Sequence, residues 1–204
     1  MMKVLRYTLL SDGSSDAALM PIVEWLIAEH RPDLGILGQA AAGLETSDRT
    51  LLERVPAAIK MYPCSLLFVH RDAEGEPTEL RLHEIERACA KVDVLYVPIV
   101  PVRMTEAWLL SDEVAIRSAA ENRNGSMALN LPAKRNWESL PDPKGILFET
   151  LVIASGKQGR ALAKFNPHRQ RPLVAQRTIS FAGLRGIPSF DFFESQLIEK
   201  LRNF

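Results

Sequence analysis

The sequence predicts an α/β protein with an open, mainly parallel, Rossmann-like sheet and helices on both faces. Two alternating patterns indicate this fold class. Short, almost continuous apolar runs are typical of buried parallel strands. Between them, apolar residues recur every three or four positions, as in amphipathic helices. The composition agrees, because 204 residues with 47% hydrophobic and 25% charged side chains can bury a sizeable core.

The first strand is predicted at residues 4–10 and ends at the turn cluster 11–16, which offers helix caps. An amphipathic helix follows, and Pro21 predicts either a kink at this position or a helix whose regular part begins near Met20. The next predicted elements are a weaker strand at 34–41, a helix at 47–61, a strand at 65–69, a helix opened by Pro77 and Thr78, and a strand at 94–102 broken by Pro98 and Pro101. Thr105 can cap the helix after that strand.

The pattern changes near residue 121, where polar, loop-like sequence replaces the alternation. We therefore expect an α/β core at 1–120 and a helical, basic elaboration at 121–204 that packs on this core. Loops are predicted at 122–132, 140–144 and 166–171, and helices near 146–155 and 157–165. Pro188 and Ser189 begin a last amphipathic helix.

The neutral total of 25 basic and 25 acidic residues hides an asymmetry. Residues 1–132 contain 13 Lys and Arg against 19 Asp and Glu, whereas residues 133–185 contain ten against three. A basic surface favours a nucleic-acid partner, and a solvated surface without a partner is the alternative. Trp137 is a candidate for base stacking, although packing is favoured. The basic residues expected to contact nucleic acid are Arg71, Lys144, Lys157, Arg160, Lys164, Arg169 and Arg171.

The sequence favours a cytoplasmic protein. No apolar run approaches the roughly 20 residues that span a bilayer, and the first ten residues lack a signal-peptide pattern. Cys64 and Cys89 lie at no metal-ligand spacing and are expected to be reduced, buried thiols.

Acidic side chains follow three of the predicted strands. The pairs are Asp12 with Asp16, Asp72 with Glu74, and Glu106 with Asp112. Because carboxyl ends of parallel strands share one edge of a sheet, these carboxylates are expected to gather there and to bind Mg²⁺ or Mn²⁺. The alternative is that they are helix caps and turn residues. The expected metal ligands are Asp12, Asp72, Glu74 and Glu106, with Asp16 and Asp112 as secondary candidates.

The acidic turns resemble the Toprim fold of topoisomerases, primases and related nucleases, in which a first-strand Glu-Gly pair and a later Asp-x-Asp pair bind Mg²⁺. The matching residues are Asp12-Gly13 and the stretch 70–74, His-Arg-Asp-Ala-Glu. The chain is more closely similar to a bacterial Toprim-like family known only as a domain of unknown function, through these stretches, 106–110 with Asp112, and 142–144. The resemblance implies phosphodiester chemistry and an ATPase partner in bacterial defence.

Two residues depart from the Toprim pattern, since Asp12 replaces a Glu and His70 replaces the first Asp of the pair. His70 could ligate metal, act as a general acid or base, contact phosphate, or simply end the strand with a hydrogen bond. The first hypothesis is a nuclease for DNA or RNA with Asp12, His70 and Asp72 as catalytic residues. The alternatives are a non-catalytic binding or regulatory subunit and a receiver-like domain with Asp72 as phosphoacceptor. The receiver-like domain would use Thr105 as switch, but the first turn supplies only one of the two carboxylates it needs.

Overall fold

A computed structural model describes residues 3–44 and 49–204, except the side chains of Ser14 and Ser15. The described chain divides into two compact units. The first comprises the chain up to Val102 together with Pro188–Phe204, and the second comprises Arg103–Ile187. Residue 120, the expected end of the core, therefore falls within the second unit, and the last helix belongs to the first.

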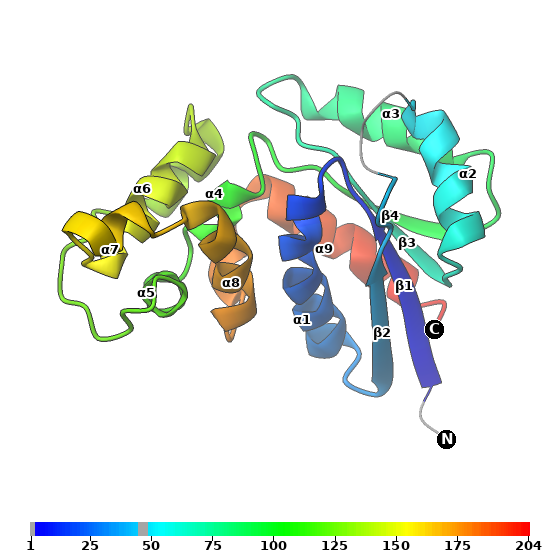
Figure 1. Cartoon of the computed structure of the whole chain (residues 1–204). Helices are drawn as coiled ribbons and strands as arrows, with labels where there is room; N and C mark the ends of the chain where they lie inside the picture. Colours follow the sequence, from blue (N-terminus) through cyan, green and yellow to red (C-terminus); the bar gives the residue numbers. More distant parts are fainter. Residues whose placement is uncertain (1–2, 45–48) are drawn as a thin grey trace. The chain divides into compact units, whose positions relative to one another are not determined.

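The first unit contains a sheet whose described strands are all parallel, in the order β2-β1-β3-β4 (Figure 1). This confirms the predicted fold class. The chain passes from β1 to β2 on one side and then to β3 on the other, so the carboxyl ends of β1 and β3 flank the position where ligands bind in such sheets. The strands are β1 (Lys3–Leu10), β2 (Leu34–Ala40), β3 (Leu66–His70) and β4 (Leu95–Ile99).

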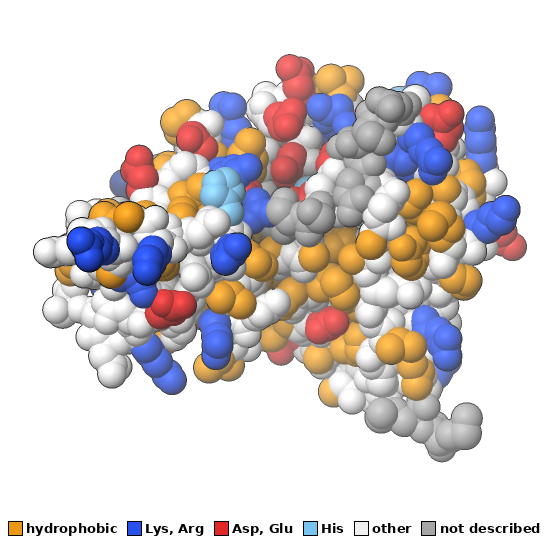
Figure 2. All heavy atoms as spheres, in the orientation of Figure 1, with side chains coloured by type: hydrophobic (Ala, Val, Ile, Leu, Met, Phe, Trp, Pro, Cys, Tyr) orange, Lys and Arg blue, Asp and Glu red, His pale blue; other side chains and the backbone are white. Residues whose placement is uncertain are grey.

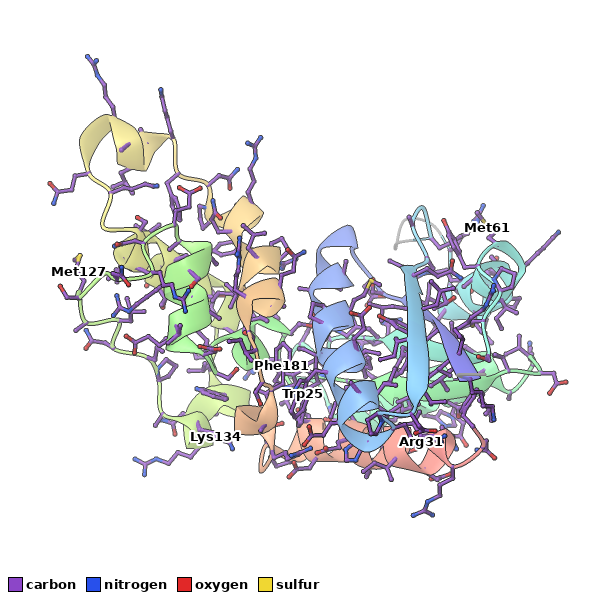
Figure 3. All side chains as sticks on the ribbon, turned by 90° about the horizontal axis from the view of Figure 1, so that it is seen from below. Trp25, Arg31, Met61, Met127, Lys134 and Phe181 are labelled. Atoms are coloured by element: carbon purple, nitrogen blue, oxygen red, sulfur yellow. The ribbon has the colours of Figure 1, made fainter. Side chains whose placement is uncertain are left out.

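One face of this sheet is covered by α1 (Met20–His30) and α9 (Pro188–Leu201), with the 3₁₀ helix η1 (Ser14–Leu19) before α1. The ring of Phe193 packs edge-on against Phe68 of β3, with centroids 6.2 Å apart. Arg31, which follows α1, donates from Nη1 to the carbonyl of Leu201 at 2.8 Å (Figure 3). These contacts explain why the last helix belongs to the sheet unit. Pro21 lies in the first turn of α1, as predicted.

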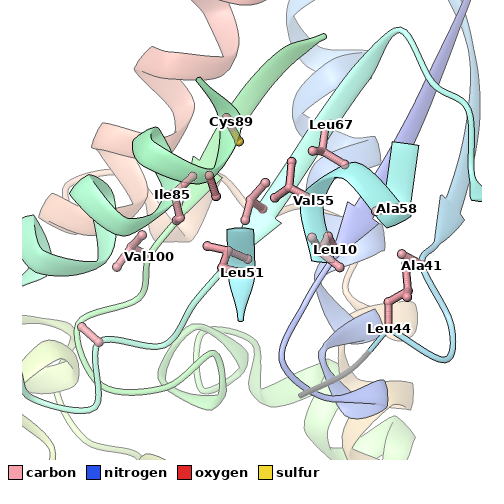
Figure 4. Close-up of a cluster of buried hydrophobic side chains, with 13 residues drawn as sticks. Leu10, Ala41, Leu44, Leu51, Val55, Ala58, Leu67, Ile85, Cys89 and Val100 are labelled. Atoms are coloured by element: carbon pink, nitrogen blue, oxygen red, sulfur yellow. The ribbon is translucent and has the colours of Figure 1, made fainter. Parts of the chain in front are cut away.

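The other face is covered by α2 (Leu51–Met61) and α3 (Thr78–Cys89). Their apolar side chains form a buried cluster with those of the strands (Figure 4). Thr50 and Glu53 begin α2 with a capping box, and the predicted positions 47 and 48 lie outside the described residues. Contrary to prediction, Pro98 does not break β4. The described sheet ends at this strand, and an edge strand tolerates the missing N–H of proline.

The second unit is helical. Its elements are α4 (Glu106–Leu109), α5 (Glu113–Ala119), η2 (Lys134–Ser139), α6 (Pro143–Ser155), α7 (Gly159–Ala163), α8 (Pro167–Arg177) and η3 (Ala182–Leu184). The predicted loop at 166–171 is wrong, because α8 begins there. Asn166 accepts a hydrogen bond from the N–H of His168 at 3.0 Å, and Pro167 occupies the first turn. Trp137 is packed, as favoured, and its Nε1 donates to the Pro132 carbonyl at 2.8 Å.

Two further expectations can be compared with the described residues, and the burial of the cysteines is confirmed for Cys89 but not for Cys64. No helix in the ranges 3–44 and 49–204 has the length and apolarity needed to cross a membrane. Cys64 and Cys89 are both free thiols. Cys89 is buried in the cluster between the sheet and its helices, whereas Cys64 is half-buried.

Candidate functional site

The turns that follow β1 and β3 meet at His70. We call these turns, residues 11–16 and 70–76, the carboxyl rim. The imidazole of His70 is buried, and its Nε2 lies 3.1 Å from Oδ1 of Asp72. Its Nδ1 lies 3.5 Å from Oδ2 of Asp16, which also accepts a hydrogen bond from the N–H of Gly13 at 2.9 Å. Two carboxylates that are remote in the sequence therefore flank one imidazole.

The turn after β3 is fixed by backbone hydrogen bonds to the segment that follows β4. The N–H groups of Arg71, Ala73 and Gly75 donate to the carbonyls of residues 99, 101 and 102 at 3.0–3.1 Å. Between these bonds the side chain of Asp72 turns toward His70. Glu74 is exposed and adopts a left-handed backbone conformation, with φ of 55°. Asp72 is thus positioned by regular main-chain contacts rather than by a free loop.

The two carboxylates control the charge of His70. Burial by itself would lower the pKa of the imidazole, but the hydrogen bonds that its N–H groups donate to Asp16 and Asp72 stabilise the imidazolium and raise the pKa to about 9. At neutral pH the ring is therefore protonated. A protonated imidazole has no lone pair, so His70 cannot accept a proton as a general base in this state. In this state the imidazolium lies between the two carboxylates and compensates part of their charge.

Asp12 has different partners, because both of its carboxylate oxygens face guanidinium groups. Nη1 of Arg54 lies 2.9 Å from Oδ1, and Nε of Arg71 lies 2.8 Å from Oδ2. Arg71 also donates to Glu84 on α3 at 2.6 Å. Arg54 comes from α2, is almost fully buried, and donates to the carbonyls of Leu44 and Ser11 as well. Asp12 therefore joins the end of β1 to α2 and to the turn after β3.

Arg54 was not among the residues predicted from the sequence, although its position on α2 could have indicated that it is buried. The buried face of α2 contains Leu51, Val55 and Ala58, and Arg54 falls on the same face by helical spacing. An arginine on an otherwise apolar stripe needs a carboxylate or several carbonyls close by. The carboxylate that it finds, Asp12, is the one expected to bind a metal.

Some of the carboxylates of the carboxyl rim are suited to binding a hard cation, and others are not. Mg²⁺ commonly binds through one or two carboxylates and keeps several waters, and Asp16 and Asp72 are two such carboxylates close to one imidazole. Asp12 does not join this pair, because its oxygens are engaged by arginines. Across residues 3–44 and 49–204, no cluster of three or more His, Cys, Asp or Glu side chains is arranged as a metal cage.

No family model, curated protein or solved structure matches this chain. The Toprim-like resemblance and the nuclease activity that it implies therefore stay predictions from the sequence.

The remaining acidic candidates, Glu106 and Asp112, lie in the second unit. Glu106 is buried and forms an ion pair with Arg171, which is also buried. Each therefore neutralises the charge of the other inside the helical unit. Asp112 caps α5 by accepting a hydrogen bond from the N–H of Ala115 at 2.9 Å, which agrees with the capping alternative. Asp142 caps α6 in the same way, through Gly145 at 2.8 Å.

The other basic candidates of the second unit lie nearer the solvent. Figure 2 shows lysine and arginine side chains spread over the surface of this unit. Lys144 is half-buried over the ring of Phe148, with Nζ 6.0 Å from the centroid. Lys157 is also half-buried, whereas Arg160, Lys164 and Arg169 are exposed. Of the expected contact residues, Arg160, Lys164 and Arg169 are thus exposed and Lys144 and Lys157 are half-buried. Arg71, Arg171 and Lys157 are each paired with a carboxylate.

Proposed function

We propose that this protein is a Toprim-like, Mg²⁺-dependent phosphodiester hydrolase acting on DNA or RNA, with its centre at the carboxyl rim. One observation carries the proposal: His70 joins the carboxylate of Asp16, from the turn after β1, to that of Asp72, from the turn after β3. This is the position where open parallel sheets bind ligands. Both carboxylates also reach the surface, with side-chain exposures of 12% and 23%.

Each residue has a role in this proposal. Asp16 and Asp72 would hold the ion. The bound ion would stabilise the negative charge that develops on the phosphate oxygens. His70, as an imidazolium, holds the two carboxylates in place and reduces their mutual repulsion. Arg71 pairs with Asp12 and Glu84, so it holds the turn after β3 in place and its charge is already compensated. Asp12 acts on the shape of the rim through Arg54 and Arg71 rather than as a metal ligand.

The test is cleavage of labelled DNA and RNA with Mg²⁺ or Mn²⁺, with a neighbouring ATPase added where one accompanies the gene. The Asp72→Asn variant should lose at least about a hundredfold in rate, because it removes a charged ligand. Asp93→Asn is the matched control, since Asp93 is exposed and precedes β4 at the opposite end of the sheet. A wild-type rate in Asp72→Asn would overturn the proposal.

A second candidate is a non-catalytic nucleic-acid-binding or regulatory subunit. The observation that favours it is the engagement of Asp12, the residue in the position of the first Toprim carboxylate, by two arginines. This candidate expects the wild-type protein to bind nucleic acid without cleaving it in any metal. It also expects Asp72→Asn and Asp93→Asn to bind equally well.

A further inference from the structure

A concave site of about 380 Å³ lies within the second unit, between the segment after α6 and the first turn of α8. Its volume is within the range of small-molecule pockets, about 300–1,000 Å³. We call it the basic pocket. Its lining includes Glu121, Lys157, Lys164, Phe165, Arg169 and Gln170.

The charge of the basic pocket matches a phosphomonoester. Lys157, Lys164 and Arg169 bring three positive charges, and Glu121, which pairs with Lys157 at 2.7 Å, removes one. The net charge of about +2 complements a terminal phosphate, which carries about −1.5 to −2 at neutral pH. A phosphodiester in a strand has only about one negative charge. Lys164 and Arg169 are exposed, so both can reach a ligand in the pocket.

The uncharged part of the basic pocket suits a nucleoside. Phe165 is half-buried and presents an aromatic wall, with Nζ of Lys157 5.6 Å from the ring centroid. Gln170 is half-buried and also lines the pocket. An amide side chain can both donate and accept hydrogen bonds, as the edge of a base or a sugar hydroxyl requires. Aromatic walls and amide side chains are the groups that proteins commonly use to bind bases.

We propose that the basic pocket binds a nucleotide through its terminal phosphate, with the nucleoside against Phe165 and Gln170. The ligand is either a free nucleotide or the phosphorylated end of a nucleic-acid strand, since both present the same chemistry. This inference goes beyond the proposed hydrolase activity and does not require it.

The test measures binding to the full-length protein by calorimetry and fluorescence anisotropy, with AMP, adenosine, and a short oligodeoxyadenylate with or without a 5′-phosphate as probes. AMP should bind at least about tenfold more tightly than adenosine, because the phosphate contacts are charge-assisted. The double variant Lys164→Gln, Arg169→Gln should lose about tenfold or more in AMP affinity. Arg177→Gln is the matched control, because Arg177 is an exposed cation of α8 that does not line the pocket.

The outcomes separate the two sources of ligand. Tight binding of AMP alone supports a free-nucleotide site, and a preference for the 5′-phosphorylated strand over the 5′-hydroxyl strand supports a strand end. Equal losses in Arg177→Gln and the double variant would overturn the proposal in favour of a general polyanion surface. Equal affinity for AMP and adenosine would overturn it as well. Asp72→Asn should keep full AMP affinity, so failure of the hydrolase proposal leaves this result unchanged.

Discussion

The guanidinium of Arg54 is 1% exposed, and its Nη1 lies 2.9 Å from Oδ1 of Asp12. The same side chain donates from Nε to the carbonyl of Leu44 at 2.6 Å and from Nη2 to the carbonyl of Ser11. One buried cation from α2 thus satisfies a carboxylate and two carbonyls around the end of β1. Because this end carries the carboxyl rim, the stability of the first unit and the shape of the rim depend on the same contact.

Arg54→Met should therefore lower the free energy of unfolding by about 3 kcal/mol. The substitution keeps most of the apolar stem, but it leaves the Asp12 carboxylate without one cation and two carbonyls without a donor. Urea-induced unfolding followed by circular dichroism measures the change. Arg87→Met is the control, since Arg87 is exposed on α3, and it should stay within about 0.5 kcal/mol of the wild type. Equal midpoints for the two variants would contradict this role of Arg54.

The effects of Asp12→Asn and Arg54→Met on the free energy of unfolding should be non-additive. If the carboxylate acts through the buried guanidinium, the double variant should be more stable than the sum of the single effects predicts, by about 1–3 kcal/mol. The measurement is a double-mutant cycle of unfolding free energies. An Asp12 that serves mainly as a metal ligand would instead show additive losses of stability, together with a loss of metal binding in Asp12→Asn that Asp72→Asn reproduces.

The stability of the protein should fall as the pH rises from about 6.5 to about 9. The pKa of His70 is raised from 6.5 in the unfolded chain to about 9 by Asp16 and Asp72, against the opposing effect of burial. A raised pKa means that the folded state holds the proton more tightly, so this contribution is complete below pH 6.5 and is lost as His70 deprotonates. Its size is on the order of 3 kcal/mol. Unfolding curves over this range should show the slope in the wild type and not in His70→Gln.

The fold class and the succession of strands and helices could be predicted because their sequence signals are local. Each buried strand is a short apolar run, and each connecting helix has its own periodic face. The two errors have different causes, one in the tertiary structure and one in the local sequence. Pro98 breaks a strand only where its N–H is needed, and the edge position of β4 is set by the fold rather than by the sequence nearby. Asn166 and Pro167 are typical of loops and of helix beginnings alike, so polarity alone could not distinguish the two.

The carboxyl rim could be predicted only in part, for a different reason. Strand ends of a parallel sheet converge, so the meeting of residues from the turns after β1 and β3 follows from the topology. The topology does not determine which side chains pair within the rim. Asp12 faces Arg54, 42 positions later in the sequence, and Glu106 faces Arg171, 65 positions later. A sequence without an alignment carries no sign of such pairs, except for the arginine on the apolar face of α2.

The two cysteines should differ in reactivity. Burial raises the pKa of Cys89 to about 12, and it also raises the pKa of the half-buried Cys64. Since the thiolate is the reactive form, iodoacetamide at mildly alkaline pH should label Cys64 slowly and Cys89 only when the protein unfolds. Peptide mass spectrometry of time points, with a sample in denaturant as control, measures both rates. Rapid labelling of Cys89 in the folded protein would contradict its burial between the sheet and its helices.

Gly38→Ala tests the packing of β2 against β1. A Cβ at Gly38 would lie 2.3 Å from Cζ of Tyr7, a contact that requires movement of the ring. The ring has little freedom, because its hydroxyl donates to Glu24 at 3.0 Å and the ring forms a T-shaped contact with Phe68 at a centroid distance of 5.3 Å. Overpacking of this kind costs about 1–3 kcal/mol, and this variant should fall at the upper end.

The matched control for Gly38→Ala is Gly183→Ala. A Cβ at Gly183 would meet no heavy atom of the described residues within 4 Å, so the same substitution should change the unfolding free energy by less than about 0.5 kcal/mol. Because both variants replace glycine by alanine, their difference removes most of the effect on the unfolded chain and leaves the cost of the contact with Tyr7. Equal stability of the two variants would mean that Tyr7 can move, and the hydrogen bond from Tyr7 to Glu24 would then not restrain the ring.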